Sequence, residues 1–579
     1  IETDDLNATK IWCIVALDID TSEIFKYGPN DIEKGIKLLQ SSDKLIGHNI
    51  IGFDIPVLKK LKGVDLYDKK LVDTLVLSRL FNPTREGNHS LESWGYRLNH
   101  NKIEFEEFKE YSEDMLNYCE NDVLLNYKIY QHLKTESKGF TKQSVEIEHK
   151  VAKILNDQRE KGFYFDIKNA SILLAELKSK IHEVETEVKK EFTPAKKKLV
   201  IYPKYKKDCV SISKMGQFEN GKSTRLTEEE YKCLLDKEAN KDFSPIYRIQ
   251  ETEFNLGSRK QIGERLIEFG WKPKNFTPTG QPIVDEGTLN KVDIPQAKQI
   301  VEYLMLQKRI AQISSWLEKV SDDSRIRGFV NHNGTVTGRM THRDPNAGQI
   351  PSTRVEYGKE CRSCWTVPTG YKLVGIDASG LEIRMLAHMM NDKDFINEVL
   401  NGDIHTSNQR LAGLESRDKA KTFIYALCYG ASDKRLSTIL GGSRENAKRV
   451  RERFFLNLPS FKSLKDKVAR NSKLGYLKGL DGRKLFVRSE HSALNTLLQG
   501  AGALVMKQAL ILFVHYIRDL DAHCVANVHD EWQVEVREDQ ADEVGKRGVQ
   551  AIIDAGALLK LNCPLDGEYN VGQNWSETH

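Results

Sequence analysis

The chain has 579 residues, too many for one hydrophobic core, so three or four domains are expected. Its 87 basic and 83 acidic residues give a net charge of +4, too small to indicate a nucleic-acid ligand by itself. No apolar run approaches the roughly 18 residues of a membrane span, and the N-terminus lacks the order of a signal peptide. Nine scattered cysteines indicate reduced thiols in a cytoplasmic protein.

The first 140 residues alternate strand-like and helical runs. Apolar runs at 11–17 and 44–46 predict strands, and residues 31–40 and 118–134 have helical periodicity. This order is typical of an α/β domain.

The next part of the chain changes character twice. Residues 143–190 are helical and heavily charged, which is typical of a connecting or arm-like element. Residues 192–250 are rich in Lys, Tyr, Gly and Ser with little periodicity, so they look like an insertion. Helical periodicity returns at 258–270 and 296–320, and from about 326 onward strands and helices mix in one large domain.

Carboxylates stand at the ends of two apolar, strand-like runs that are far apart in the sequence. Asp377 follows residues 373–376, whereas Asp530 and Glu531 follow residues 524–528. A polar turn would explain either position alone. Burying a carboxylate is costly unless a cation or hydrogen-bond donors compensate. If the two strands are neighbours, Asp377 and Asp530 can share two divalent ions, and Mg²⁺ prefers such a sparse set completed by substrate phosphates.

Between these carboxylates lies a predicted helix with a basic face. Arg417, Lys421 and Tyr425 are spaced four residues apart and so line one side of it. Two cations followed by an aromatic ring can hold a polyphosphate and then the attached sugar and base. The alternative is a solvated basic stripe with a half-buried tyrosine, which the nearby carboxylates disfavour.

Three stretches of this region resemble a known family. They read GIDASGLEIR at 375–384, RDKAKTFIYALCYG at 417–430 and VHDE at 528–531. In this order they resemble motifs A, B and C of family A DNA polymerases. Flanking stretches such as GTVTGRMTHRDPNAGQIP and GQNWSETH are similar to the replicative polymerases of short-tailed bacteriophages. The resemblance covers the chain except residues 192–250, where it is weak.

The resemblance implies an α/β and α+β multidomain fold. A ribonuclease H-like exonuclease domain would be followed by a right-hand polymerase with palm, fingers and thumb. The expected parts are the exonuclease-like domain at 1–142, linker helices and thumb at 143–325 with the basic insertion at about 192–250, the first part of the palm at 326–395, the fingers at 396–497 and the second part of the palm at 498–579.

The resemblance also implies roles in the polymerase site. Asp377 and Asp530 would bind two Mg²⁺ ions, for which Mn²⁺ can substitute, and Glu531 would be a third catalytic carboxylate in a supporting role. The residues expected to bind the incoming nucleotide are Glu382, His405, Arg417, Lys421, Tyr425 and Tyr429. The residues expected to contact primer–template DNA are Arg339, Asn495, Gln499 and His529.

A second set of carboxylates lies near the N-terminus. Tyr118 and Asp122 would lie one helical turn apart, so a phenol and a metal-bound carboxylate can address the same water. With Glu2 and Asp54, which would be further metal ligands, they resemble the site of DEDD-type 3′–5′ proofreading exonucleases. In that family the motif begins Asp-x-Glu, and here the Asp would precede Ile1. We therefore expect the exonuclease fold with impaired activity in this chain.

Two other functions stay open. A single-subunit RNA polymerase shares the palm and the two-metal chemistry, but Glu382 argues against it, because in the resembling family this residue blocks a 2′-hydroxyl. A non-catalytic DNA-binding or processivity subunit is disfavoured by the presence of Asp377, Asp530, Arg417 and Lys421 together.

The insertion at 192–250 predicts a partner. Its basic and aromatic residues could follow DNA phosphates or dock a protein, with a solvated loop as the alternative; they are Lys196, Lys197, Lys198, Lys204, Lys206, Lys207, Tyr202 and Tyr205. Phage relatives carry a thioredoxin-binding insertion at this place. A thioredoxin-like host protein is therefore one expected partner, beside primer–template DNA and deoxynucleoside triphosphates. We expect phage genome replication in the host cytoplasm and no membrane partner.

Overall fold

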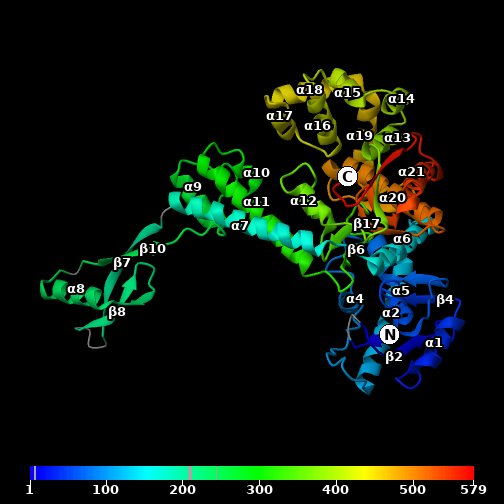
Figure 1. Cartoon of the computed structure of the whole chain (residues 1–579), viewed down its shortest axis with the longest axis horizontal. Coiled ribbons are helices and arrows are strands. Elements are labelled where there is room, and N and C mark those ends of the chain that lie inside the picture. The colour runs from blue at the N-terminus through cyan, green and yellow to red at the C-terminus, as the bar shows by residue number, and fades with distance from the viewer. Residues whose placement is uncertain (5–7, 193, 207–210, 243) are drawn as a thin grey trace. The chain divides into compact units, whose positions relative to one another are not determined.

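The computed structural model describes residues 1–4, 8–192, 194–206, 211–242 and 244–579. The chain forms two compact units (Figure 1). The first unit combines Ile1–Ile167 with Glu318–His579, and the second is Lys168–Leu317. Helices and strands are mixed in both, which confirms the predicted α/β and α+β class.

The N-terminal part of the first unit is an α/β domain, as predicted. Strands β1, β2 and β3 pair in that order, antiparallel, and β4 runs parallel to β5. Strand β2 is buried on both sides, because Ile14 packs with Ile36 and Ile55 whereas Cys13 packs with Cys119. The elements are β1 (Glu2–Thr3), β2 (Ile11–Leu17), β3 (Ile24–Tyr27), α1 (Ile32–Ser41), β4 (Lys44–Gly47), α2 (Asp54–Lys62), β5 (Lys70–Asp73), α3 (Thr74–Phe81), α4 (Leu91–Arg97) and α5 (Glu113–Glu136).

Helix α6 (Lys142–Lys161) connects this domain to the rest of the first unit. It begins at Thr141, whose hydroxyl accepts a hydrogen bond from the Ser144 amide at 3.1 Å. It ends at Gly162, whose φ of 69° stops the helical turn. Two short strand pairs follow in the fold: β6 (Phe163–Tyr164) with β11 (Arg325–Ile326), and β12 (Phe329–Asn331) with β13 (Thr341–Arg343).

The C-terminal part is built on a four-stranded antiparallel sheet, here called the C-terminal sheet. Its strand order is β17 (Ala522–Val528), β18 (Glu531–Arg537), β14 (Tyr371–Ala378) and β19 (Gly567–Gly572). Helices α20 (Ala493–Tyr516) and α21 (Ala541–Leu558) pack on one face. Phe513 of α20 stacks on Trp532 with ring centres 5.1 Å apart. Gly548 of α21 lets the helix approach Ile376, where a Cβ would come within 2.4 Å of the isoleucine.

A group of helices follows strand β14 and shares one apolar core with the C-terminal sheet. Phe423, Phe454 and Phe461 meet in its interior, with ring centres 5.6–5.7 Å apart. Helix α12 (Gly358–Ser363) precedes β14. The elements that follow β14 are α13 (Leu381–Met390), α14 (Lys393–Asn401), α15 (Ile404–Ala412), α16 (Arg417–Cys428), α17 (Asp433–Leu440), α18 (Arg444–Asn457), α19 (Pro459–Ser472), β15 (Tyr476–Lys478) and β16 (Lys484–Phe486).

The second unit contains a helical core and a small sheet. The helices pack around apolar residues such as Phe192, Ile262 and Leu304. They are α7 (Ile167–Glu191), α9 (Arg259–Glu268), α10 (Glu286–Leu289) and α11 (Pro295–Leu317).

Residues 192–250 have more regular structure than their weak periodicity suggested. They form a four-stranded sheet, here called the insertion sheet, in the order β10 (Ile246–Thr252), β7 (Ala195–Tyr205), β8 (Ile212–Phe218) and β9 (Ser223–Arg225), and α8 (Glu228–Ala239) packs on one face. Only that face is buried, and its core is small, which weakens the sequence signal. Of the predicted contact residues, Lys207 and the side chains of Lys196 and Lys197 lie outside the described residues.

Within the described residues, one helix is long and apolar enough to cross a membrane. It comprises residues 490–516, and 67% of its most apolar stretch is buried inside the fold. Sequence analysis missed this run, because Gln499 and Lys507 interrupt it. Its burial against the C-terminal sheet is typical of a core helix.

Replacing Phe513 by alanine should test the packing of α20. The change removes the stack on Trp532 and leaves a cavity, so we expect the free energy of unfolding to fall by about 3–5 kcal/mol. Urea denaturation followed by tryptophan fluorescence measures it. Leu456→Ala is the control, because Leu456 is 81% exposed. Equal losses in the two variants would contradict the assignment of Phe513 to the core.

Candidate active sites

Three predicted carboxylates meet at the ends of the two central strands of the C-terminal sheet. Strands β14 and β18 pair in a register that sets Asp377 opposite Glu531. Because side chains alternate along a strand, both point away from the face that Ile376 and Trp532 bury. Asp530 lies in the turn that precedes β18. The fold therefore brings Asp377, Asp530 and Glu531 together.

The protein compensates the burial of Asp377 and Asp530 only in part, since His529 and Arg339 favour the charged form of Asp530. Burial, followed by the neighbouring carboxylates of Asp530 and Glu531, raises the pKa of Asp377 to about 7. Burial also raises the pKa of Asp530. Neither forms an ion pair within the described part of the chain. Oxygen ligands without a protein partner fit a hard divalent cation.

Few possible metal ligands are present at these strand ends. Among the described residues, no cluster of three or more His, Cys, Asp or Glu side chains is arranged to hold a metal. Mg²⁺ is usually bound in proteins by one or two carboxylates, with waters and substrate phosphates as the other ligands. The donors present at Asp377 and Asp530 therefore fit Mg²⁺ in the presence of a phosphate substrate.

Glu531 differs from its two neighbours because its oxygens are occupied. Its carboxylate accepts hydrogen bonds from Trp575 Nε1 at 2.7 Å, from His579 Nδ1 at 2.5 Å and from the Gln533 amide. Burial would raise the pKa of Glu531, but the hydrogen bonds from His579, Gln533 and Trp575 outweigh burial and lower it. Glu531 is therefore a fixed, charged group.

Helix α16 carries Arg417, Lys421 and Tyr425 on one face, and His405 of α15 lies beside them. The rings of His405 and Tyr425 are 6.3 Å apart, centre to centre. Burial, followed by the charges of Arg417 and Lys421, lowers the pKa of His405. Its Nδ1 is buried with no hydrogen-bond partner among the described residues. Arg417 is turned toward Asp403, with which it forms an exposed ion pair at 2.8 Å.

Glu382, in the first turn of α13, connects two further predicted residues. Its Oε1 accepts a hydrogen bond from Arg339 Nη2 at 3.0 Å, and its Oε2 accepts one from the Tyr429 hydroxyl at 2.7 Å. Glu382, Tyr429, Tyr425 and Asn495 line one pocket. The Asn495 Oδ1 is buried and has no hydrogen-bond partner in the described structure, so it is available to a ligand.

The two remaining predicted DNA contacts lie at the borders of this region. Gln499 follows Asn495 by one turn of α20 and is half-buried. His529 is exposed in the turn before Asp530, with a φ of 58°.

The carboxylates of the N-terminal domain also gather, from β1, the first turn of α2 and the middle of α5. Burial raises the pKa of Glu2 to about 8, although the Ile1 ammonium group lowers it, and Asp122 and Asp54 add to the rise. Burial also raises the pKa of Asp122. The Asp122 Oδ1 is buried without a partner among the described residues, whereas the Ile1 ammonium lies 3.2 Å from Asp54 Oδ1. An unsatisfied buried carboxylate oxygen fits a cation here too.

Lys102 belongs to this second site, and sequence analysis missed it. Its Nζ lies 3.1 Å from Asp122 Oδ2 and 4.6 Å from the centre of the Tyr118 ring. Lys102 lies in an irregular segment, so no spacing marks it. Lys102 and Tyr118 line a cleft of about 1470 Å³, whose lining also includes Arg79 and Arg343. The cleft thus offers cations and an aromatic ring beside the carboxylates.

Sequence analysis also missed the groups that hold Glu531. Trp575 and His579 belong to the GQNWSETH stretch, which indicated the family but implied no role for these two residues. Gln533 lies two residues after Glu531 on the same face of β18, so strand alternation could have found it.

Comparison with known proteins agrees with the sequence motifs. Residues 227–577 match the family model described as DNA polymerase family A, and residues 10–138 match the one described as 3′–5′ exonuclease. The chain is 33% identical to the DNA-directed DNA polymerase of Enterobacteria phage T3, with 100% of this chain and 99% of the relative covered. It is also 33% identical to the DNA-directed DNA polymerase of Escherichia phage T7, with 99% and 98% covered.

A solved structure has the same fold. It is the POL domain of Pol1 from M. smegmatis in complex with DNA primer-template and dNTP, with a TM-score of 0.78 and 20% identity over 98% of this chain and 93% of that one. The family matches confirm the resemblance. The chain therefore belongs to DNA polymerase family A and contains a 3′–5′ exonuclease domain.

Proposed function

We propose that this polymerase extends a primer 3′ end by template-directed addition of deoxynucleotides at Asp377 and Asp530. The observation that carries the proposal is the register of β14 and β18, which sets Asp377 opposite the fixed Glu531, with Asp530 in the adjoining turn. Primer–template DNA and deoxynucleoside triphosphates would be the substrates.

Asp377 and Asp530 would hold two Mg²⁺ ions, or Mn²⁺ in their place. Such ions, when bound, activate the attacking primer hydroxyl and neutralise charge on the triphosphate and the departing pyrophosphate. Glu531 would act from a fixed position, because Trp575 and His579 hold both of its oxygens. Its negative charge would help to keep the cation ligands oriented.

The incoming triphosphate would bind along helix α16. Arg417 and Lys421 would contact its phosphates, and the nearby His405 has a free Nδ1 to add a hydrogen bond. Arg417 would exchange its ion pair with Asp403 for a phosphate, which costs little because the pair is exposed. Tyr425 would pack beside the sugar and base of the nucleotide.

Glu382 would form the floor beneath the incoming sugar. Its bonds to Arg339 and Tyr429 keep the carboxylate in one place, which supports a role in excluding a 2′-hydroxyl. Arg339 and Asn495 would read the minor-groove edge of the new base pair. Gln499 and His529 would contact the neighbouring nucleic-acid backbone and primer end.

The N-terminal domain would remove nucleotides from a single-stranded 3′ end. Glu2, Asp54 and Asp122 would hold the metal ions, and Tyr118 would orient the attacking water. The positive and aromatic lining of the adjacent cleft supports binding of a DNA strand there.

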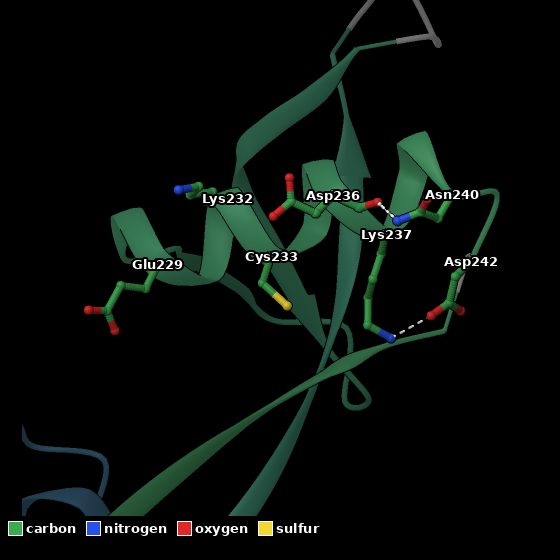
Figure 2. A pocket seen from close by; sticks show the side chains of 7 residues that line it. All are labelled: Glu229, Lys232, Cys233, Asp236, Lys237, Asn240 and Asp242. Carbon is green, nitrogen blue, oxygen red and sulfur yellow. Dashed lines mark hydrogen bonds and ion pairs between the residues drawn. The ribbon is translucent and has the colours of Figure 1, made fainter.

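We further infer that residues 192–250 increase processivity by binding DNA phosphates. One face of the insertion sheet is covered by α8, and Figure 2 shows the outer side of that helix, where Lys237 pairs with Asp242. Strand alternation turns Lys198 of β7 and Tyr247 of β10 to the other face, where the Lys198 Nζ lies 3.8 Å from the Tyr247 ring centre.

That uncovered face combines exposed aromatic and apolar side chains with lysines, including Lys204. The exposed side chains are Tyr202, Met215, Tyr247 and Ile249. Cations among aromatic rings suit a nucleic-acid strand. A thioredoxin-like host protein stays the alternative occupant of this face.

We also propose that the enzyme replicates a phage genome in the host cytoplasm. The support is that two relatives matching almost the whole chain are phage DNA polymerases.

Separate carboxylate substitutions should separate the two activities. Asp530→Asn is expected to slow primer extension at least about 10²-fold, because loss of even a group that only hydrogen-bonds to a metal ligand costs 10–100-fold. Digestion of a labelled single-stranded oligonucleotide should continue at the rate of the parent. Asp54→Ala should have the opposite effect. Both reactions are followed on gels with Mg²⁺ present. Asp519→Asn is the control, because Asp519 is an exposed partner of Arg547. Extension by Asp530→Asn within tenfold of the parent would overturn the metal assignment.

Glu382→Ala should weaken the rejection of ribonucleotides. Loss of the carboxylate opens space below the sugar and releases Tyr429, so we expect the ratio of kcat/KM for a deoxynucleotide over its ribonucleotide to fall at least about tenfold. Single-nucleotide addition to one primer measures the ratio. Glu415→Ala, a change at an exposed carboxylate before α16, serves as the control. An unchanged ratio would show that Glu382 does not face the sugar.

Neutralising the uncovered face of the insertion sheet should shorten products. With Lys198→Gln and Lys204→Gln together, fewer nucleotides should be added per binding event. The logarithm of the affinity for primer–template DNA should also depend less steeply on the logarithm of the salt concentration, with a slope smaller by about 2. Single-nucleotide addition should be unchanged. Lys232→Gln on α8, which covers the opposite face, is the matched control. A loss of product length seen only when thioredoxin is added would instead indicate a docked protein.

A further inference from the structure

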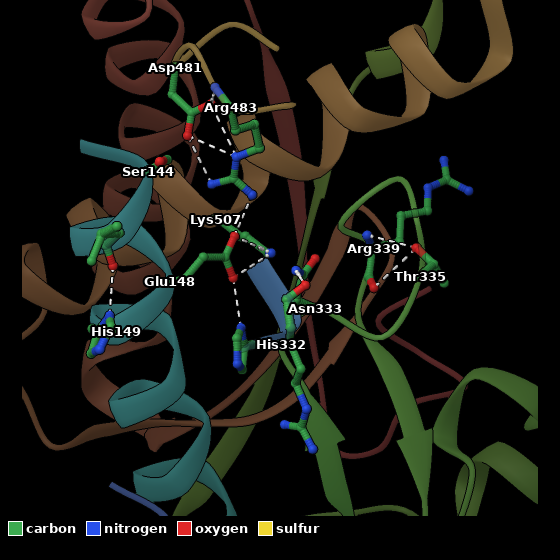
Figure 3. A network of polar contacts seen from close by, with 12 residues as sticks. Ser144, Glu148, His149, His332, Asn333, Thr335, Arg339, Asp481, Arg483 and Lys507 are labelled. Atoms are coloured by element: carbon green, nitrogen blue, oxygen red, sulfur yellow. Dashed lines mark hydrogen bonds and ion pairs between the residues drawn. The ribbon is translucent and has the colours of Figure 1, made fainter. Parts of the chain in front are cut away.

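Five buried charged or titratable side chains meet beneath the turn that carries Arg339 (Figure 3). We call them the Glu148 cluster; its members are Glu148, His332, Asp481, Arg483 and Lys507, none more than 4% exposed. They come from α6, from the segment after β12, from the loop between β15 and β16, and from α20. The cluster thus joins four segments that are far apart in the sequence.

Glu148 is the centre of the cluster. Its Oε1 accepts hydrogen bonds from Arg483 Nη1 at 2.5 Å and from Lys507 Nζ at 2.7 Å. Its Oε2 lies 2.8 Å from Lys507 Nζ and 2.7 Å from His332 Nδ1. Arg483 also reaches Asp481, with Nε 2.9 Å from Oδ2. Both oxygens of Glu148 are therefore held from two sides.

The charges within the cluster balance. Burial lowers the pKa of His332 to about 4, so the imidazole is neutral at pH 7 and donates from Nδ1. Burial would raise the pKa of Glu148, but Lys507 and Arg483 outweigh burial and lower it. Two carboxylates thus face two cations. Apolar residues of similar volume often stabilise a fold as well as such a cluster does. Stability alone therefore does not explain why these charged side chains are buried here.

The cluster lies close to a tight turn. Gly338 has a φ of 76°, and its amide donates to the Thr335 carbonyl at 2.9 Å. The Arg339 amide donates to the Thr335 hydroxyl at 3.1 Å. A Cβ placed on Gly338 would lie 3.7 Å from Arg483 Nη1 and 3.9 Å from Lys507 Nζ. The nearest atom to that Cβ would be Asn333 Oδ1, at 3.3 Å, so the two cations of the cluster lie close to the residue that precedes Arg339, just beyond Asn333.

The same region is tied to the exonuclease domain. His149, next to Glu148 on α6, accepts a hydrogen bond at Nε2 from the Asp73 amide at 2.9 Å. Asn333, next to His332, donates its side-chain amide to the Arg79 carbonyl at 3.0 Å. The first bond ties helix α6 to β5, and the second ties the segment that leads into the turn to α3.

We propose that Glu148, with Arg483 and Lys507, is a positioning group for Arg339. This inference rests on the function proposed above for Arg339 in reading the minor-groove edge of the new base pair, which becomes the primer-terminal pair after each addition. The cluster fixes the turn, and the turn directs the guanidinium toward Glu382, 3.0 Å away. Small displacements of a positioned group can cost about 10²-fold in rate. Loss of the cluster should therefore reduce extension and its sensitivity to the primer-terminal base pair.

The test is a cycle with two changes, each made in the full chain. The first change is Glu148→Gln with Lys507→Met, which removes one charge of each sign and leaves the cluster neutral. The second change is Arg339→Ala. Steady-state kcat and KM are measured on primers with a matched and with a mismatched 3′ end, and thermal unfolding reports whether each variant is folded.

We expect the cluster variant to lose about tenfold in kcat on the matched primer and most of its preference for a matched end. In the Arg339→Ala background the same change should alter kcat by less than about twofold, because groups that act through one another are not additive. If Arg339→Ala is impaired and the losses in kcat from the two changes add, the positioning inference is wrong, whereas the proposed role of Arg339 stands. An Arg339→Ala enzyme with unchanged kcat and unchanged preference would overturn the proposed role of Arg339 and the inference with it.

Two further variants keep the test decisive. Arg325→Met with Glu535→Gln removes a part-buried ion pair, 2.9 Å long, from the same unit and should not change the preference for a matched end. If this control loses the preference for a matched primer end to a similar extent, the cluster only stabilises the fold and the inference is wrong. If the cluster variant does not fold, Lys507→Arg replaces it in the cycle, because it keeps the charge and changes only the geometry.

Discussion

The pairing of β14 with β18 is the constraint on which the polymerase site depends. One register sets Ile376 opposite Trp532 on the apolar face and Asp377 opposite Glu531 on the other. A slip by one residue would turn the carboxylates into the core and the apolar residues out of it. The hydrophobic contacts of α20 and α21 with the sheet therefore also fix the position of the carboxylates.

The carboxylates brought together in this way differ in how they are satisfied. Glu531 is buried and receives hydrogen bonds from Trp575 and His579, so it stays charged. Asp377 is partly buried among other carboxylates, and its pKa rises to about 7. The same contrast recurs in the exonuclease domain, where Asp122 keeps one buried oxygen free. Unsatisfied carboxylates are costly in a fold, and a bound cation removes the cost.

Helix α6 links these two regions through adjacent side chains. Glu148 contacts Arg483 and Lys507 on the polymerase side, whereas His149 contacts the backbone of Asp73 on the exonuclease side. Its sequence is heavily charged and predicted only a connecting arm. Burial of Glu148 in a balanced ion cluster gives this connection a defined geometry, because each charge needs its partner in place.

The sequence by itself determined the local elements and the residue types of both sites. Apolar runs predicted β2 and β14, and a spacing of four residues set Tyr118 beside Asp122, because these signals are local in the sequence. Tertiary structure alone decided that Lys102 reaches Asp122, that His579 holds Glu531 and that residues 192–250 form a sheet. These outcomes depend on desolvation and contacts between distant residues, which no local pattern encodes.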